Sequence, residues 1–188
     1  MGRIKRQWHP HYFDHVVVRG NNRQVIFNEV RDFAEFFRVL RYVYEQYPFT
    51  LLAYCLMNNH YHLLIRSATP LSKTMMMINR RYSDYYKKKY QYTGHLYENR
   101  YYSDMILTPE GILEVSRYIH QNPIRTKIPL VQALEHYPYS SFKYYKSPQY
   151  APVYLETSRL IQFFRLEEQR TYDYYEAYCR EMHLVQPQ

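Results

Sequence analysis

Apolar positions along the chain follow two different periods, and their alternation predicts a mixed α+β fold. Alternating and β-branched runs predict four strands, at Tyr12–Gly20, Phe49–Met57, His60–Ser67 and Tyr97–Leu107. Apolar residues at helical spacing predict three helices, at Glu29–Gln46, Pro70–Gln91 and Thr108–Asn122. The order β-α-β-β-α-β-α is typical of a ferredoxin-like antiparallel sheet with two helices on one face and a third helix after the last strand.

The second and third predicted strands form a hairpin whose register assigns their side chains to faces. We expect a two-residue turn at Asn58–Asn59 because asparagine tolerates a positive φ. That turn places Cys55 opposite His62 and Met57 opposite His60. Since residues two apart on a strand share a face, both histidines point the same way, and we expect them on the open face of the sheet. The bulkier face, expected beneath the helices, holds Leu52, Tyr54, Leu56, Tyr61, Leu63 and Ile65.

The last predicted helix carries a tyrosine beside its core-facing stripe. Thr108 is a typical N-cap, and Pro123 disfavours helical geometry in the residue before it. Tyr118 lies on the flank of the helix, and Asn122 follows it by one turn, so both side chains point in one direction. The stripe expected to face the core consists of Ile112, Val115 and Ile119.

The distribution of charge separates a basic domain from an acidic C-terminal segment. Residues Pro70–Tyr102 contain seven Lys and Arg residues against two acids, a net charge of +5. Residues Tyr154–Glu181 contain four Arg and six acids, a net charge of −2, in a helical pattern. We therefore predict a domain at residues 1–147 and a helical C-terminal extension at residues 148–188 that serves packing or interaction.

The net charge of +8 favours a polyanionic partner such as nucleic acid. The 25 tyrosines offer ring faces on which unpaired bases can stack, and Lys and Arg can neutralise phosphates. The two cysteines do not form a disulfide framework, and the longest strongly apolar run, Leu51–Met57, is far short of the ~20 residues that span a bilayer. These features predict a cytoplasmic protein without a membrane association.

His60 and His62 are the strongest candidates for metal chemistry. Two imidazoles on one face can hold a divalent ion and leave positions open for oxygen ligands. The alternative is a pair of exposed or hydrogen-bonded histidines without a shared role. A structural zinc site with the cysteines is disfavoured because no C-x₂₋₄-C or H-x₃₋₅-H spacing occurs.

Several segments resemble, in order, the motifs of one family of DNA-processing enzymes. The segment Tyr54–Leu64 is similar to the YCLMPNHxHLL signature of the HUH single-tyrosine transposases. Further segments resemble motifs of their REP-associated branch: Val18–Gln24, Gly94–Tyr101, Ser116–Arg125 and Tyr137–Ser141. The departures are Asn58, where the family usually has proline, and Tyr139, where it has tryptophan.

The resemblance implies a ferredoxin-like fold and the cleavage and rejoining of single-stranded or hairpin DNA through a 5′-phosphotyrosine intermediate. It places the nucleophile at Tyr118 and a divalent metal, Mg²⁺ or Mn²⁺, on His60, His62 and Asn122. Together with the charge pattern, it predicts DNA contacts by Arg19, Asn21, Arg23, Arg80, Arg81, Lys87, Lys88, Arg100, Tyr101 and Arg125.

Other functions remain open at this point. A non-catalytic module on the same fold could bind single-stranded nucleic acid by aromatic stacking alone. A replication initiator or conjugative relaxase is expected to be larger than 188 residues. A metal-dependent nuclease without a covalent intermediate needs carboxylates near the ion, and none has a persuasive position. The oligomeric state is open between monomer and dimer.

Overall fold

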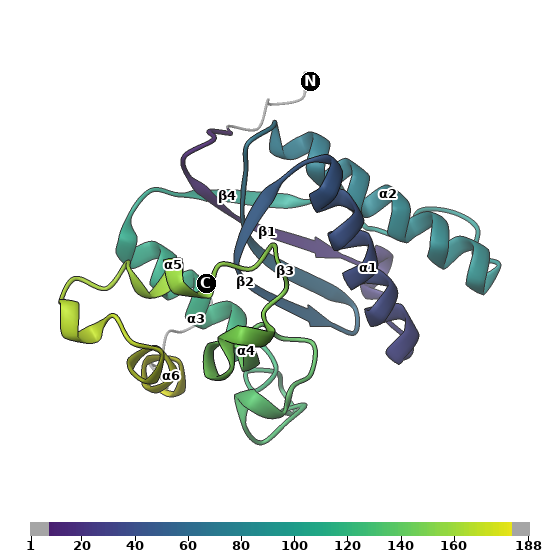
Figure 1. Cartoon of the computed structure of the whole chain (residues 1–188). Helices are drawn as coiled ribbons and strands as arrows, with labels where there is room; N and C mark the ends of the chain where they lie inside the picture. The colour runs from purple at the N-terminus through teal and green to yellow at the C-terminus, as the bar shows by residue number, and fades with distance from the viewer. Residues whose placement is uncertain (1–7, 182–188) are drawn as a thin grey trace.

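The computed structural model describes residues 8–181, which form one antiparallel four-stranded sheet with helices on both faces (Figure 1). The strands are β1 (Phe13–Arg19), β2 (Phe49–Met57), β3 (His60–Ser67) and β4 (Tyr102–Ile106). Their spatial order is β2-β3-β1-β4, with every neighbouring pair antiparallel. The predicted α+β class and ferredoxin-like arrangement are therefore confirmed.

Two helices cover one face of the sheet, as predicted: α1 (Val30–Gln46) and α2 (Leu71–Tyr90). Their apolar stripes bury Phe36, Ile78 and Tyr82 against the sheet side chains Tyr61 and Leu63. Aromatic rings dominate this core, so buried hydroxyls need partners. The Tyr82 hydroxyl, for example, donates to the carbonyl of Ile26.

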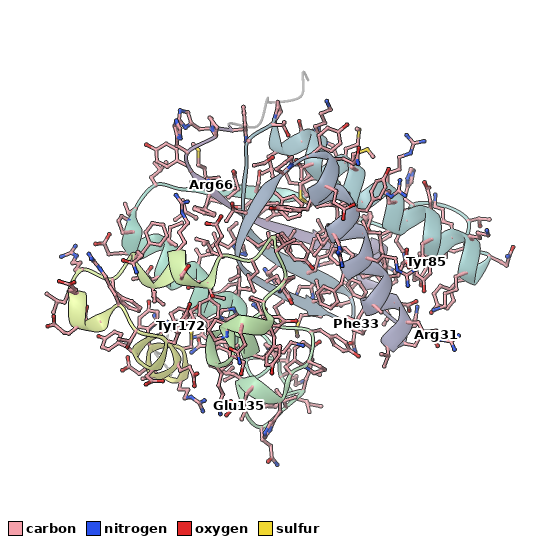
Figure 2. All side chains as sticks on the ribbon, viewed as in Figure 1. Arg31, Phe33, Arg66, Tyr85, Glu135 and Tyr172 are labelled. Atoms are coloured by element: carbon pink, nitrogen blue, oxygen red, sulfur yellow. The ribbon has the colours of Figure 1, made fainter. Side chains whose placement is uncertain are left out.

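A buried carboxylate fixes α1 to α2. Asp32 accepts hydrogen bonds from the backbone N–H of Asn28, from the hydroxyls of Tyr85 (2.9 Å) and Tyr90 (2.7 Å), and from Lys89 Nζ (2.5 Å). Tyr85, labelled in Figure 2, comes from α2 and reaches this acid on α1. The same hydrogen bonds hold the pKa of Asp32 below its ordinary value against the opposing effect of burial. Lys89 thus forms an ion pair with Asp32 within the fold.

The opposite face is covered by α3 (Pro109–Gln121) and by the C-terminal segment, so the prediction of an open face is wrong. The reason is non-local: Phe142, Tyr145 and Tyr175 form one buried core with Cys55 and Met57 of β2. The remaining elements of the described chain after α3 are η2 (Leu134–His136), α4 (Lys143–Lys146), η3 (Pro148–Tyr150), α5 (Thr157–Ile161), η4 (Glu167–Gln169) and α6 (Tyr172–Arg180). Whether residues 148–188 form a unit separate from residues 1–147 stays a prediction, and residues 182–188 lie outside the described residues.

An irregularity in β2 changes the face of one predicted residue. The register between β2 and β3 shifts between Leu51 and Ala53. As a result Leu52 packs in the core beneath α3, whereas Tyr54 and Leu56 lie beneath α1 and α2 as predicted. A bulge of this kind inserts one residue and reverses the alternation locally.

The fourth strand begins later than predicted, at Tyr102 instead of Tyr97. The segment before it pairs only through an isolated bridge between Tyr97 and Gly20. There β1 gives way to the short helix η1 (Asn21–Arg23), in which Asn22 has φ 47° and Arg23 has φ 57°. Since these left-handed residues turn the chain away, no continuous ladder forms.

Asp14 is a buried acid in β1, 2% exposed, opposite Ile65 of β3 and Met105 of β4. Burial and, secondarily, the charge of Asp104 raise its pKa from 3.8 to about 6. The folded state therefore binds a proton that the unfolded state releases between these values, so this group's contribution to stability falls as the pH rises from 4 to 6.

Replacing Asp14 by asparagine is expected to raise the free energy of unfolding by about 1–2 kcal/mol at pH 8 and to change it little at pH 4. The amide keeps the shape of the side chain and removes the charge. Urea unfolding between pH 4 and pH 8 measures the effect, with the exposed Asp173→Asn as control. An equal gain at both ends of this range would contradict the prediction.

Candidate active site

The β2–β3 hairpin places His60 and His62 as predicted. Cys55 lies opposite His62 and Met57 opposite His60. The turn is held from the neighbouring loop, because the N–H groups of Ile26 and Phe27 both donate to the carbonyl of Asn58. Neither Asn58 nor Asn59 has a positive φ, so the expected left-handed turn does not occur.

Tyr118 projects from α3 toward these histidines. The Thr108 side chain accepts a hydrogen bond from Gly111 N–H, which confirms the predicted start of the helix. The predicted stripe is confirmed too, since Ile112 and Ile119 are buried and Val115 packs at the edge of the same core. Tyr118 remains 41% exposed. Its ring centroid lies 5.6 Å from that of His62.

A buried polar network holds α3 against the C-terminal segment. His120, fully buried two residues after Tyr118, has Nε2 2.7 Å from Ser141 Oγ and Nδ1 2.8 Å from the Tyr175 hydroxyl. The Tyr175 hydroxyl also donates to Ser116 Oγ at 3.0 Å. Because α6 supplies Tyr175, the C-terminal segment fixes the helix that presents Tyr118 to the sheet.

A cavity of about 350 Å³ opens beside Tyr118 and the sheet. Charged and polar side chains from β1 and from the segment before β4 line it together with Tyr118. Its lining consists of His15, Val17, Arg19, His62, Glu98, Asn99, Arg100, Tyr102 and Tyr118. The site residues predicted from the sequence do not include His15, Val17, Glu98, Asn99 or Tyr102. His15 could have been found, because the period of two in β1 places it on the face away from the buried Val16 and Val18.

The three histidines here are held neutral by burial. Burial lowers the pKa of His15 and of His60 from 6.5 to about 4. Burial lowers the pKa of His62 well below 6.5, and the proximity of His60 adds to this effect. A neutral imidazole keeps the lone pair that a metal ligand needs.

The residues present fit a divalent ion held by few protein ligands. The rings of His60 and His62 are 5.0 Å apart, and His60 Nδ1 lies 2.7 Å from Asn59 Oδ1, an acceptor that leaves Nε2 of His60 free for an ion. Asn122 Nδ2 donates to the carbonyl of Tyr118 at 2.9 Å, so the amide oxygen is its remaining ligand atom. In residues 8–181, no three His, Cys, Asp or Glu side chains gather as a metal cluster.

The structure brings some predicted DNA contacts to the cavity and leaves others apart. Arg19 and Arg100 line the cavity. Asn21 and Arg23 are exposed in η1, next to the β2–β3 turn, and Arg125 is exposed after α3. On α2, Arg80, Arg81 and Lys88 are exposed and Lys87 is half-buried, with Arg81 stacked 3.7 Å from the Tyr42 ring centroid.

Tyr101 does not suit the stacking role predicted for it. Its ring is 5% exposed and belongs to the core beneath α1 and α2, whereas the next residue, Tyr102, is 61% exposed and lines the cavity. Because successive side chains of an extended segment point to opposite faces, Tyr101 points into the core and Tyr102 points away from it. Tyr102 is therefore the better candidate for contact with an unpaired base.

Comparisons with known proteins bear on the fold and the family of this chain. The family model described as Transposase IS200 like matches residues 8–122, more than half of the chain. A solved structure of a REP-associated tyrosine transposase bound to a REP hairpin has the same fold, with a TM-score of 0.66 and 16% identity over 83% of this chain and 92% of that chain. A search of curated protein sequences gives no match. Within residues 8–181, no helix is both long and apolar enough to cross a bilayer. The chain belongs to the IS200-like transposase family.

Proposed function

We propose that this transposase cleaves and rejoins single-stranded DNA through a 5′-phosphotyrosine on Tyr118, as a member of the REP-associated branch. The observation that carries the proposal is the placement of the exposed Tyr118 ring 5.6 Å from the His62 ring, at a cavity lined by Arg19 and Arg100. A phenol, neutral imidazoles and guanidinium groups together suit attack on a phosphodiester. Action on DNA in the cytoplasm, predicted from the sequence, is part of this proposal.

The chain's own residues account for the covalent steps. The Tyr118 oxygen attacks the phosphorus and the bond from phosphorus to the DNA 3′ oxygen breaks. The proton that the phenol loses is balanced by the proton that the leaving 3′ oxygen takes up, so a free 3′-hydroxyl is released. Arg19 and Arg100 bind and orient the phosphate oxygens. A divalent ion on His60, His62 and the Asn122 amide oxygen would offset the negative charge that develops on the phosphoryl group. Since one phosphodiester replaces another, a 3′-hydroxyl can reverse the step and rejoin the strand.

The proposed DNA partner is a hairpin with a single-stranded flank. The structural neighbour was solved with a REP hairpin, and the exposed basic residues of α2 with the exposed Tyr102 offer phosphate and base contacts on this chain. A non-catalytic binding module would use the same surface. The two functions differ in whether a protein–DNA bond forms.

Affinity for such a hairpin is expected to exceed that for blunt duplex and to fall by about 10³-fold between 50 and 200 mM salt, if about six phosphates are contacted. The double variant Arg80→Ala/Lys88→Ala should reduce the salt slope by about two. Fluorescence anisotropy at graded salt measures both effects, with Arg165→Ala in the C-terminal segment as the control for lost charge. Equal affinity for a blunt duplex of the same length would contradict the prediction.

Cleavage itself is tested with a labelled hairpin oligonucleotide and Mn²⁺ on a denaturing gel. The proposal predicts a labelled band that migrates with the protein and a shortened DNA strand with a 3′-hydroxyl. Tight hairpin binding without either product would favour the binding module.

A further inference from the structure

A third histidine contacts the proposed metal site without belonging to it. His15 of β1 has Nε2 3.0 Å from His62 Nδ1, and the two rings stack nearly parallel, with centroids 5.3 Å apart and 21° between planes. Strand pairing enforces this contact, because Val17 is directly opposite His62 and His15 is one pleat further along the same face.

The contact restricts where the protons can be. A hydrogen bond between two neutral imidazoles needs one N–H donor and one unprotonated acceptor nitrogen. If His15 donates, the proton of His62 resides on Nε2 and that nitrogen cannot bind a cation. If His62 donates from Nδ1, its Nε2 keeps a free lone pair. Only the second arrangement is compatible with metal binding by His62 Nε2.

The surroundings of His15 favour the second arrangement. With Nε2 acting as acceptor, the proton of His15 is on Nδ1, and the acidic side chain of Asp104 lies directly across the β1–β4 ladder. His60 has the equivalent acceptor in Asn59, whose Oδ1 is 2.7 Å from Nδ1. In the second arrangement both proposed ligand histidines donate from Nδ1, His60 to Asn59 Oδ1 and His62 to His15 Nε2.

We propose that His15 is a positioning residue that accepts the Nδ1 proton of His62 and thereby directs the Nε2 lone pair of His62 at a divalent cation. The inference rests on the proposed function of His60 and His62. It assigns His15 no direct contact with metal or DNA, since its Nε2 is used by His62.

The test is Mn²⁺ binding by the full chain without DNA, measured by isothermal titration calorimetry. His15→Leu keeps similar bulk and removes the acceptor, and we expect Mn²⁺ affinity to fall about 10–100-fold. His15→Gln presents an amide oxygen near the position of Nε2 and should restore most of the affinity. The exposed His136→Leu is the matched control and should bind like the wild type.

The tautomer of His62 gives a readout that a purely structural role of His15 would not move. Long-range ¹H–¹⁵N spectra of the metal-free protein should show His62 protonated at Nδ1 in the wild type and His15→Gln. If His15→Leu does not fold, His15→Asn, whose amide is too short to reach His62, replaces it.

The outcomes separate the inference from the function on which it rests. Wild-type affinity in His15→Leu or His15→Asn, with wild-type protein binding Mn²⁺, would overturn the role of His15 and leave the metal site standing. Failure of the wild type itself to bind Mn²⁺ would overturn both. A His62 protonated at Nε2 in the wild type would also overturn the role of His15.

Discussion

Replacing Tyr118 by phenylalanine is expected to reduce DNA cleavage by about 10³-fold or more while hairpin affinity stays within about twofold. The change removes one oxygen and keeps the ring that contacts His15 and His62. Because the side chain is 41% exposed, no buried hydroxyl loses a partner and the fold should survive. Denaturing electrophoresis of labelled hairpin DNA measures cleavage, and anisotropy measures binding.

Tyr102→Phe is the matched control for this prediction. Tyr102 lines the same cavity and is even more exposed, but it projects from a strand of the sheet. We expect its phenylalanine variant to cleave DNA at close to the wild-type rate. Cleavage that survives in Tyr118→Phe and disappears in Tyr102→Phe would move the nucleophile to the strand.

The second large effect is expected at the histidine pair. His60→Ala and His62→Ala should each reduce Mn²⁺-dependent cleavage by about 10³-fold, because each removes one of very few protein ligands. Hairpin binding should persist at a moderate level, since basic and aromatic residues elsewhere supply most of it. His95→Ala, an exposed histidine in the segment before β4, is the control.

Metal titration separates ligand loss from damage to the fold. A thermal unfolding curve close to that of the wild type would show that the variants are folded, and added Mn²⁺ should then restore little or no activity to the double variant. Full cleavage by His60→Ala/His62→Ala in Mg²⁺ would overturn the proposed metal site.

Local patterns predicted the parts of the fold that local forces determine. The period of two in β3, with a two-residue turn before it, was enough to place His60 and His62 on one face in the correct register. The cap at Thr108 and the apolar stripe were enough to locate α3 and leave Tyr118 on its exposed flank. These features depend on neighbouring residues, so the sequence alone could reveal them.

The errors have non-local causes. The face expected to be open is covered because Phe142, Tyr145 and Tyr175, distant along the chain, pack onto it. The late start of β4 follows from the left-handed residues of η1 in a different loop. The contact between His15 and His62 depends on pairing between β1 and β3, which strand periodicity does not specify.

The two departures from the family motifs have simple structural explanations. Asn58 has no positive φ and its carbonyl accepts two N–H groups, so the turn is compatible with the proline that the family usually has here. Tyr139 stacks flat on Phe33, with ring centroids 3.5 Å apart, and so fills an aromatic position with another aromatic ring. Neither departure alters a reactive group.

Identification of the covalently modified residue is the most direct test of the central claim, that Tyr118 is the nucleophile. The full chain is incubated with a hairpin carrying a single-stranded flank and Mn²⁺, denatured, and digested with trypsin for mass spectrometry. Cleavage after Arg117 and Arg125 isolates a peptide in which Tyr118 is the only tyrosine, whereas Tyr101 and Tyr102 fall in the preceding peptide. We expect a 5′-phosphonucleotide on the Tyr118 peptide of the wild type and none in Tyr118→Phe. A nucleotide on the preceding peptide, or an adduct that persists in Tyr118→Phe, would contradict this claim.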